Sequence, residues 1–389
     1  MRKFNASRLV DARTYNKITG EDLATAVGIK KQAISQFENG KASPEYGTVC
    51  KISNVLRFPV QFFYEDDIPV LQGNTYFRAL FTSNKRELNS QKIKTKYVAQ
   101  IYATLTRYVD FRAYNVPVFE DTTDISKIAS QLRDYWGLGQ EPIPDMVSLL
   151  ERNGVVMSEF ATDSSKIDAF SQYDEIKGVP YHCIVLGTEK GSFVRRQFSC
   201  AHELGHIILH EKYEDLSEIS REVFRRREDE ANTFAAEFLL PREAFLADLQ
   251  RHANKLNRYI ELKRKWRVSI AAMIYRAHDL HEITDSQYQY LMRQGSQNGW
   301  RQIEPLDEYL PLRHPKAIKQ AINLIILNGV LTGSQLLQEI SNDGITLPKT
   351  VIDEILSLEP DTIVEDDIDS SSKIISFAQL RANNSKETL

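Results

Sequence analysis

The chain has few cysteines and no long apolar run. Its 389 residues contain three cysteines, Cys50, Cys183 and Cys200, which stand far apart. Three dispersed cysteines do not form a disulfide framework, so we interpret them as buried thiols in a reducing compartment. No apolar stretch reaches the roughly 18 residues that a membrane helix needs, and the N-terminal residues lack the apolar core of a signal peptide. These absences predict a cytoplasmic protein with no membrane partner.

A strong overall charge is also lacking, since the formal net charge is −4. The charge is unevenly distributed, however. Residues 1–64 contain ten basic and five acidic residues, so they carry +5 and the remainder carries −9. A basic end on an acidic body is compatible with nucleic-acid binding by that end alone.

The length and the periodicity predict several domains. A chain of 389 residues is too long for one ordinary core. Helical periodicity dominates, and two segments, residues 153–160 and 180–187, have the alternating β-branched pattern of strands. Helix returns from residue 199 onward, and residues 315–340 read as two short helices joined by a turn. The pattern predicts a mainly α fold with a small β-sheet.

Two candidate linkers divide the chain. Residues 65–73 are acidic and contain a proline, and residues 295–305 are polar and contain two glycines. We therefore expect an all-α domain at residues 1–66, an α+β domain at 74–295 and a small helical region at 300–389 that ends in a polar, fraying tail.

Residues 19–44, "TGEDLATAVGIKKQAISQFENGKASP", have the pattern of two helices joined by a tight turn. Thr19 is placed to cap the first helix with Asp22 at its third position, and Gly28 permits the turn. The second helix leaves Lys31, Gln32 and neighbouring polar residues outward, where glutamine can pair with adenine and lysine can reach guanine or phosphate. A helical protein–protein module with a solvated charged face is the alternative.

From Arg8 to Phe63 the sequence resembles the Xre/Cro-type helix-turn-helix family. The resemblance implies about five helices and a homodimer bound to double-stranded operator DNA. It places the recognition helix at residues 31–39 and implies two groups of DNA contacts: Lys31, Gln32 and Gln36 with bases, and Asn39 and Lys41 near phosphates.

The stretch "FSCAHELGHIILH", residues 198–210, holds three of the eight histidines. His202 and His206 are four residues apart, so on a helix they project from one face and can bind one tetrahedral ion. Glu203 stands beside the first of them, where its carboxylate can take a proton from a zinc-bound water whose pKa is lowered toward about 7. A core helix with hydrogen-bonded histidines is the alternative.

A third ligand would decide between these interpretations. The Cα atom of His210 would lie roughly 12 Å from that of His202 on a straight helix, so a capping or supporting role is expected for His210. In residues 225–241 the buried stripe of the next helix passes through Ala231 and Phe234. Glu228 falls about 50° from its centre, Glu230 about 110° and Asp229 about 150°, so only Glu228 turns toward the apolar side.

A carboxylate on that side needs a partner, and a zinc ion would supply one. Asn232 lies one turn beyond Glu228, placed to hydrogen-bond a ligating histidine. The block from Arg195 to Pro241 resembles the ImmA/IrrE family of zinc metallopeptidases, matching it at His202, Glu203, His206, Glu228 and Asn232. The resemblance implies a zincin-like domain with Zn²⁺ on two histidines and Glu228. Cys200 departs from the apolar residue expected there.

The resemblance also implies a role, because members of this family cleave repressor proteins and so induce stress-response or mobile-element genes. Three functions stay open at this stage. The first is a DNA-binding zinc endopeptidase that cleaves a repressor, in trans or within its own chain. The second is a transcription factor whose peptidase-like domain senses a ligand or partner. The third is the antitoxin of a toxin–antitoxin pair. The general base Glu203 favours the first.

Overall fold

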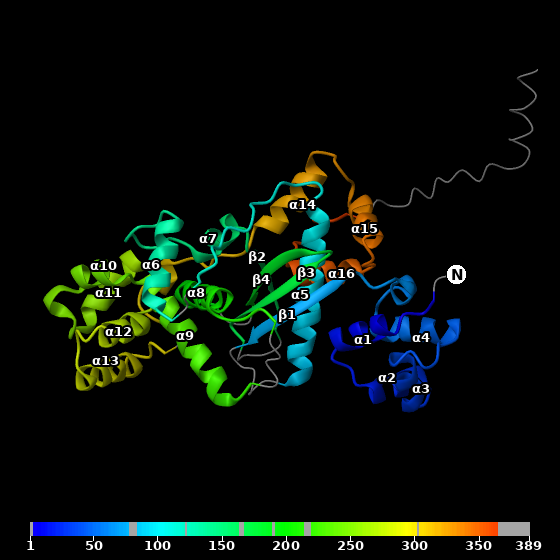
Figure 1. Cartoon of the computed structure of the whole chain (residues 1–389), viewed down its shortest axis with the longest axis horizontal. Coiled ribbons are helices and arrows are strands. Elements are labelled where there is room, and N and C mark those ends of the chain that lie inside the picture. The colour runs from blue at the N-terminus through cyan, green and yellow to red at the C-terminus, as the bar shows by residue number, and fades with distance from the viewer. Residues whose placement is uncertain are drawn as a thin grey trace, which may run out of the picture.

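The computed structural model describes residues 3–77, 84–120, 123–162, 167–188, 191–213, 219–301 and 303–364. It is mainly helical, with one four-stranded sheet, which confirms the predicted fold class. Figure 1 shows the small N-terminal helices on one side of the sheet and the larger helical group on the other. The polar tail beyond residue 364 lies outside the described residues.

The N-terminal helices follow the predicted turn. They are α1 (Ala6–Tyr15), α2 (Gly20–Val27), α3 (Lys31–Glu38), α4 (Tyr46–Leu56) and the short 3-10 helix η1 (Val60–Tyr64). Thr19 and Asp22 form a reciprocal capping box at the start of α2. Gly28 ends α2 with φ of 78°, a conformation that glycine adopts without strain. The predicted helix-turn-helix geometry is therefore confirmed.

The sheet has the order β1-β3-β4-β2, formed by β1 (Val70–Phe77), β2 (Val156–Phe160), β3 (Ala169–Ile176) and β4 (Val179–Gly187). β2 and β4 pair in parallel, and the other pairs are antiparallel. Strands β2 and β4 were predicted, whereas β1 and β3 were not. The expectation of a linker at residues 65–73 is wrong from Val70 onward, because Val70 pairs with Ile176 of the distant strand β3.

The sheet separates two apolar cores. Strand alternation turns Val156, Phe160 and Val185 toward α5 (Lys85–Leu105), and it turns Met157, Ile184 and Leu186 toward α8 (Phe193–Leu209). Figure 1 shows the sheet between these two helices. α8 begins earlier than the predicted residue 199, because Ser192 caps it by accepting a hydrogen bond from the Arg195 backbone N–H (3.3 Å).

Helices on the α8 side complete the second core. They are α6 (Ile125–Tyr135), α7 (Met146–Arg152), α9 (Arg221–Leu239), α10 (Arg242–Leu249), α11 (Leu256–Trp266), α12 (Ile270–Asp279) and α13 (Asp285–Gln297), with a 3-10 turn η2 (Gln250–His252) after α10. Among the described residues, no helix is long and apolar enough to cross a membrane.

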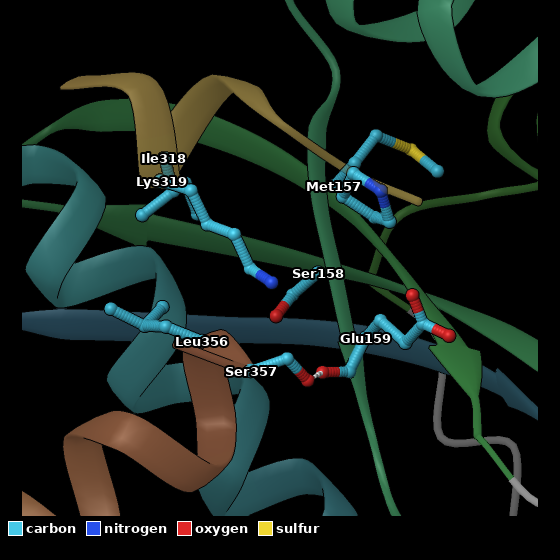
Figure 2. A pocket seen from close by; sticks show the side chains of 8 residues that line it. Met157, Ser158, Glu159, Ile318, Lys319, Leu356 and Ser357 are labelled. Atoms are coloured by element: carbon cyan, nitrogen blue, oxygen red, sulfur yellow. Dashed lines mark hydrogen bonds between the residues drawn. The ribbon is translucent and has the colours of Figure 1, made fainter. Parts of the chain in front are cut away.

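The C-terminal helices lie on the α5 side. After the 3-10 turn η3 (Asp307–Tyr309) come α14 (Ala317–Leu327) and α15 (Gly333–Asn342), the two predicted short helices, and α16 (Lys349–Leu356), which was not predicted. They attach to β2 at a cavity of only about 10 Å³, which Figure 2 shows between Ser158, Lys319 and Leu356. Ser158 donates a hydrogen bond to the Ile355 carbonyl there (2.6 Å), so the cavity is a small gap where α14 and α16 pack against β2.

The same C-terminal helices hold the N-terminal helices in place. The buried Arg8 guanidinium donates to the carbonyls of Asp66 and Gly344, both at 2.8 Å. The Tyr15 hydroxyl donates to the Glu354 carboxylate (2.6 Å). Side chains of α1–α4, α5 and α14–α16 form one continuous apolar cluster. The N-terminal and C-terminal helices therefore share a core with α5, across the boundaries expected at residues 66, 74, 295 and 300.

Candidate metal centre

Helices α8 and α9 cross closely at the "HELGH" stretch. A Cβ atom at Gly205 would lie 3.2 Å from the Cα atom of Ala231 and 3.2 Å from the Phe234 ring. Real Cβ atoms seldom come that close to a neighbour, so the glycine between Glu203 and His206 permits this approach. The approach brings the side chain of Glu228 on α9 to the two histidines of α8.

Three donor atoms converge between these helices. The Nε2 atoms of His202 and His206 are 3.1 Å apart. Glu228 places Oε1 at 3.2 Å from His206 Nε2 and Oε2 at 3.4 Å from His202 Nε2. Two ligands about 2.0–2.1 Å from a tetrahedral ion are about 3.3–3.4 Å from each other, so the spacing suits a zinc-sized ion. Within the described residues, this is the one group of three side chains that could hold a metal.

The hydrogen bonding also fits a cation. The buried Glu228 Oε1 accepts no hydrogen bond from the described residues, although it lies beside His206. On the other side, His202 Nδ1 lies 3.0 Å from the amide oxygen of Asn232. Because an amide oxygen only accepts, that Nδ1 carries the proton and the His202 Nε2 presents its lone pair to the cluster. Lone pairs that face one another in a buried site need a positive charge between them.

Burial and charge set the protonation of the cluster. Burial lowers the pKa of His206 to about 3, so its ring is neutral at physiological pH, as a metal ligand must be. Burial acts to raise the pKa of Glu228, but the two neighbouring histidines outweigh burial and hold that pKa well below its usual value. A neutral imidazole pair and an ionised carboxylate are the donor set of many zinc sites.

Glu203 lies next to His202 on α8, and its side chain is buried, with 2% of its surface exposed. The sequence placed this carboxylate beside the first histidine, and the helical geometry keeps it there.

Strand β1 contributes a residue that the sequence did not indicate. The Tyr76 ring stacks on His206, with ring centroids 4.6 Å apart, and its hydroxyl donates to the Glu211 carbonyl (3.0 Å). The Asn74 backbone N–H donates to the Lys212 carbonyl (2.7 Å), so β1 is tied to the chain just after α8. The cavity beside Tyr76 and His206 measures about 20 Å³, room for about one water.

His210 and Glu230 form a second pair beside the cluster. His210 caps α8, and its Nδ1 lies 2.9 Å from His206 Nδ1. Its Nε2 lies 3.0 Å from the Glu230 carboxylate. Glu230, which helical phase turns away from the apolar side, is 34% exposed, and its long side chain reaches from the edge of the buried stripe to His210. His210 is the C-cap residue of α8, one of the two roles expected for it.

The residues predicted to contact DNA are all exposed. Lys31, Gln32 and Gln36 lie on α3 around the buried Ile34, and Asn39 and Lys41 follow its end. Lys31 forms an exposed ion pair with Glu21 of α2 (3.0 Å), which is a weak interaction that a phosphate can replace. Asn39 donates to the Ser35 carbonyl (2.7 Å), so it also closes the helix.

Two family comparisons cover the segments that hold these residues. Residues 150–278 match the IrrE N-terminal-like domain of the M78 peptidases, and residues 11–63 match a helix-turn-helix domain. The chain joins these two domains. The IrrE N-terminal-like domain includes His202, Glu203, His206, Glu228 and Asn232, and the helix-turn-helix domain includes all five candidate DNA contacts. No curated protein matches the chain closely enough to count as a relative.

The pairing of domains defines the class of protein. A helix-turn-helix domain supports DNA binding, and the IrrE N-terminal-like domain is a metallopeptidase-like domain. The protein is therefore a DNA-binding regulator with a peptidase-like domain. Strand β1 lies outside both matched ranges, although it covers one face of His206.

Proposed function

We propose that this regulator is a zinc-dependent endopeptidase that cleaves a repressor protein, in trans or within its own chain, and so derepresses stress-response or mobile-element genes. The observation that carries the proposal is the convergence of His202, His206 and Glu228 at the spacing of a tetrahedral ion. When bound there, zinc would act as a Lewis acid and lower the pKa of a water molecule.

The residues around the ion have distinct roles in this proposal. Asn232 orients His202 by accepting the hydrogen bond from Nδ1. Glu203 is the general base: its carboxylate accepts a proton from the water that attacks the scissile carbonyl. It then gives that proton to the amine that leaves as the C–N bond breaks.

The helix-turn-helix domain would direct this activity to DNA. We propose that a homodimer binds double-stranded operator DNA, with Lys31, Gln32 and Gln36 at the bases and with Asn39 and Lys41 at the phosphates. The exposure of all five side chains supports this arrangement. Because the N-terminal helices share an apolar core with α5 and α14–α16, the peptidase domain would be held at a fixed place beside the operator.

One observation favours a second function, in which the domain senses a ligand or a partner and cleaves nothing. His202, Glu203 and His206 are each at most 2% exposed, and the cavity beside them holds about one water. A peptide substrate would have to displace the contacts of β1 with the chain after α8. The presence of Glu203 favours the peptidase, because a sensor needs no general base.

The test uses the full chain, loaded with zinc and incubated with the purified repressor encoded beside its gene. Mass spectrometry should detect two repressor fragments, or two fragments of the chain itself. His206→Ala should lose the metal in elemental analysis and should form no fragments. Stoichiometric zinc in His206→Ala would overturn the assigned site. Zinc binding without any fragment, together with a change in DNA affinity on zinc loading, would establish the sensor.

A further inference from the structure

A chain of hydrogen bonds leads outward from His206. His206 and His210 face each other through their Nδ1 atoms at 2.9 Å, and the other ring nitrogen of His210 lies 3.0 Å from the Glu230 carboxylate. This series of hydrogen bonds therefore runs from α8 through the residue that caps its C-terminus to α9. It is separate from the hydrogen bond between His202 and Asn232.

The order of the protons in this chain follows from its ends. Glu230 is a carboxylate and can only accept, so His210 Nε2 carries a proton and donates it. A neutral His210 then has a lone pair on Nδ1, which must accept a hydrogen bond from His206 Nδ1–H. With that proton on Nδ1, His206 directs the lone pair of Nε2 toward His202 and Glu228. One carboxylate thus determines the tautomer of a histidine two hydrogen bonds away.

We propose that His210 and Glu230 are positioning residues that hold His206 in its metal-binding tautomer and orientation. The inference rests on the proposed function in one respect, namely that a metal occupies the cluster. Asn232 would perform the same task for His202. Each histidine ligand would therefore be supported by a residue of α9, His202 directly by Asn232 and His206 by Glu230 through His210.

The backbone explains how His210 can take this part. α8 ends at Leu209, and His210 has extended backbone angles, φ −119° and ψ 153°, so its ring turns back along the helix. On a straight helix the ring would have lain one turn beyond His206.

The rings are also held from the side. Tyr76 stacks on His206, and its ring centroid is 5.5 Å from that of His210. The His210 side chain is 4% exposed, whereas Glu230 is 34% exposed and its other oxygen lies 3.6 Å from Arg226. A buried imidazole between two fixed partners has little freedom to change its tautomer.

The experiment measures zinc affinity by chelator competition on the full chain. Loss of a residue that supports a metal ligand typically weakens binding about 10- to 100-fold, and we expect a loss in this range for Glu230→Ala. Glu230→Gln should bind zinc within a few-fold of wild type, because its amide oxygen still accepts the His210 proton. Asp229→Ala is the matched control: it removes an exposed carboxylate from the next position of α9 and should bind like wild type.

A spectroscopic readout separates positioning from general destabilisation. With Co²⁺ in place of zinc, the visible absorption bands should shift in Glu230→Ala and keep their wild-type position in Glu230→Gln and Asp229→Ala. Equal weakening in Glu230→Gln and Asp229→Ala would assign the effect to charge alone and overturn the proposal. Unchanged affinity in Glu230→Ala would also overturn it. A wild-type chain that binds no metal would overturn the proposed function as well.

Discussion

His202 and Asn232 join the two helices of the candidate metal centre. The Nδ1 atom of His202 on α8 lies 3.0 Å from the amide oxygen of Asn232 on α9. The same imidazole presents Nε2 to His206 at 3.1 Å. A change at Asn232 therefore acts on the orientation of a ligand without removing any ligand.

Asn232→Ala should weaken zinc binding about 10- to 100-fold, because His202 loses the acceptor that fixes its tautomer. Asn232→Asp keeps an acceptor and should bind close to wild type. Chelator competition measures both. The control is Thr233→Ala, since Thr233 is exposed and its hydroxyl donates to the Asp229 carbonyl of its own helix (2.9 Å). Equal affinities in Asn232→Ala and Thr233→Ala would contradict the role of the hydrogen bond.

Asp174 on β3 should make the stability of the chain depend on pH. Burial raises its pKa from 3.8 to about 6, although the hydrogen bond from Gln172 and the charge of Lys96 oppose the rise. Below about pH 4 the group is protonated in both states, and its contribution to stability is fully present. That contribution is lost as pH rises to about 6, because the unfolded chain ionises first. The full loss is roughly 3 kcal/mol at most.

Asp174→Asn should therefore raise the melting temperature at pH 8 more than at pH 5. The amide can still accept the hydrogen bond that Gln172 donates to Oδ2 (2.6 Å). Calorimetry of wild type and variant at several pH values measures the difference, and the exposed Asp229→Asn serves as the control. The prediction is wrong if Asp174→Asn changes stability equally at pH 5 and pH 8.

The sequence predicted those parts of the site that depend on local helix geometry. The rotation of about 100° per residue in an α-helix was enough to place His202 and His206 on one face and Glu228 near the apolar side. The structure brings these three side chains together. Their role as metal ligands remains a prediction. The capping box at Thr19 and the turn at Gly28 were also readable from local chemistry.

The parts that depend on distant pairing were not predicted. Strand β1 follows an acidic, proline-containing stretch, and it exists because it pairs with β3 about 100 residues later. Nothing near Tyr76 in the sequence indicates that its ring stacks on His206. The contact of Glu230 with His210 was not predicted, because helical phase gives the direction of the Cβ atom and not the reach of a flexible side chain.

The DNA contacts should separate into two kinds. In the full chain, Gln32→Ala should lose discrimination at one base position, worth about 1–3 kcal/mol. Lys41→Ala should weaken binding to all sequences alike. It should also reduce the slope of log K against log[salt] by about one, because the loss of one phosphate contact means that one counterion fewer is released. Fluorescence anisotropy with DNA from upstream of the gene and with random DNA measures both. If both variants lost affinity equally on both DNAs, the assignment of Gln32 to bases would be wrong.

The most direct measurement of the central claim is the effect of Glu203→Gln on zinc content and on cleavage in parallel. The substitution keeps the size of the side chain and removes the carboxylate, so zinc and DNA binding should stay at wild-type levels. Cleavage should fall at least about 10²- to 10⁴-fold, because the general base is gone. In cells, the variant should leave the target genes repressed under the inducing stress. Normal induction by a zinc-loaded Glu203→Gln chain would contradict the peptidase and support the sensor.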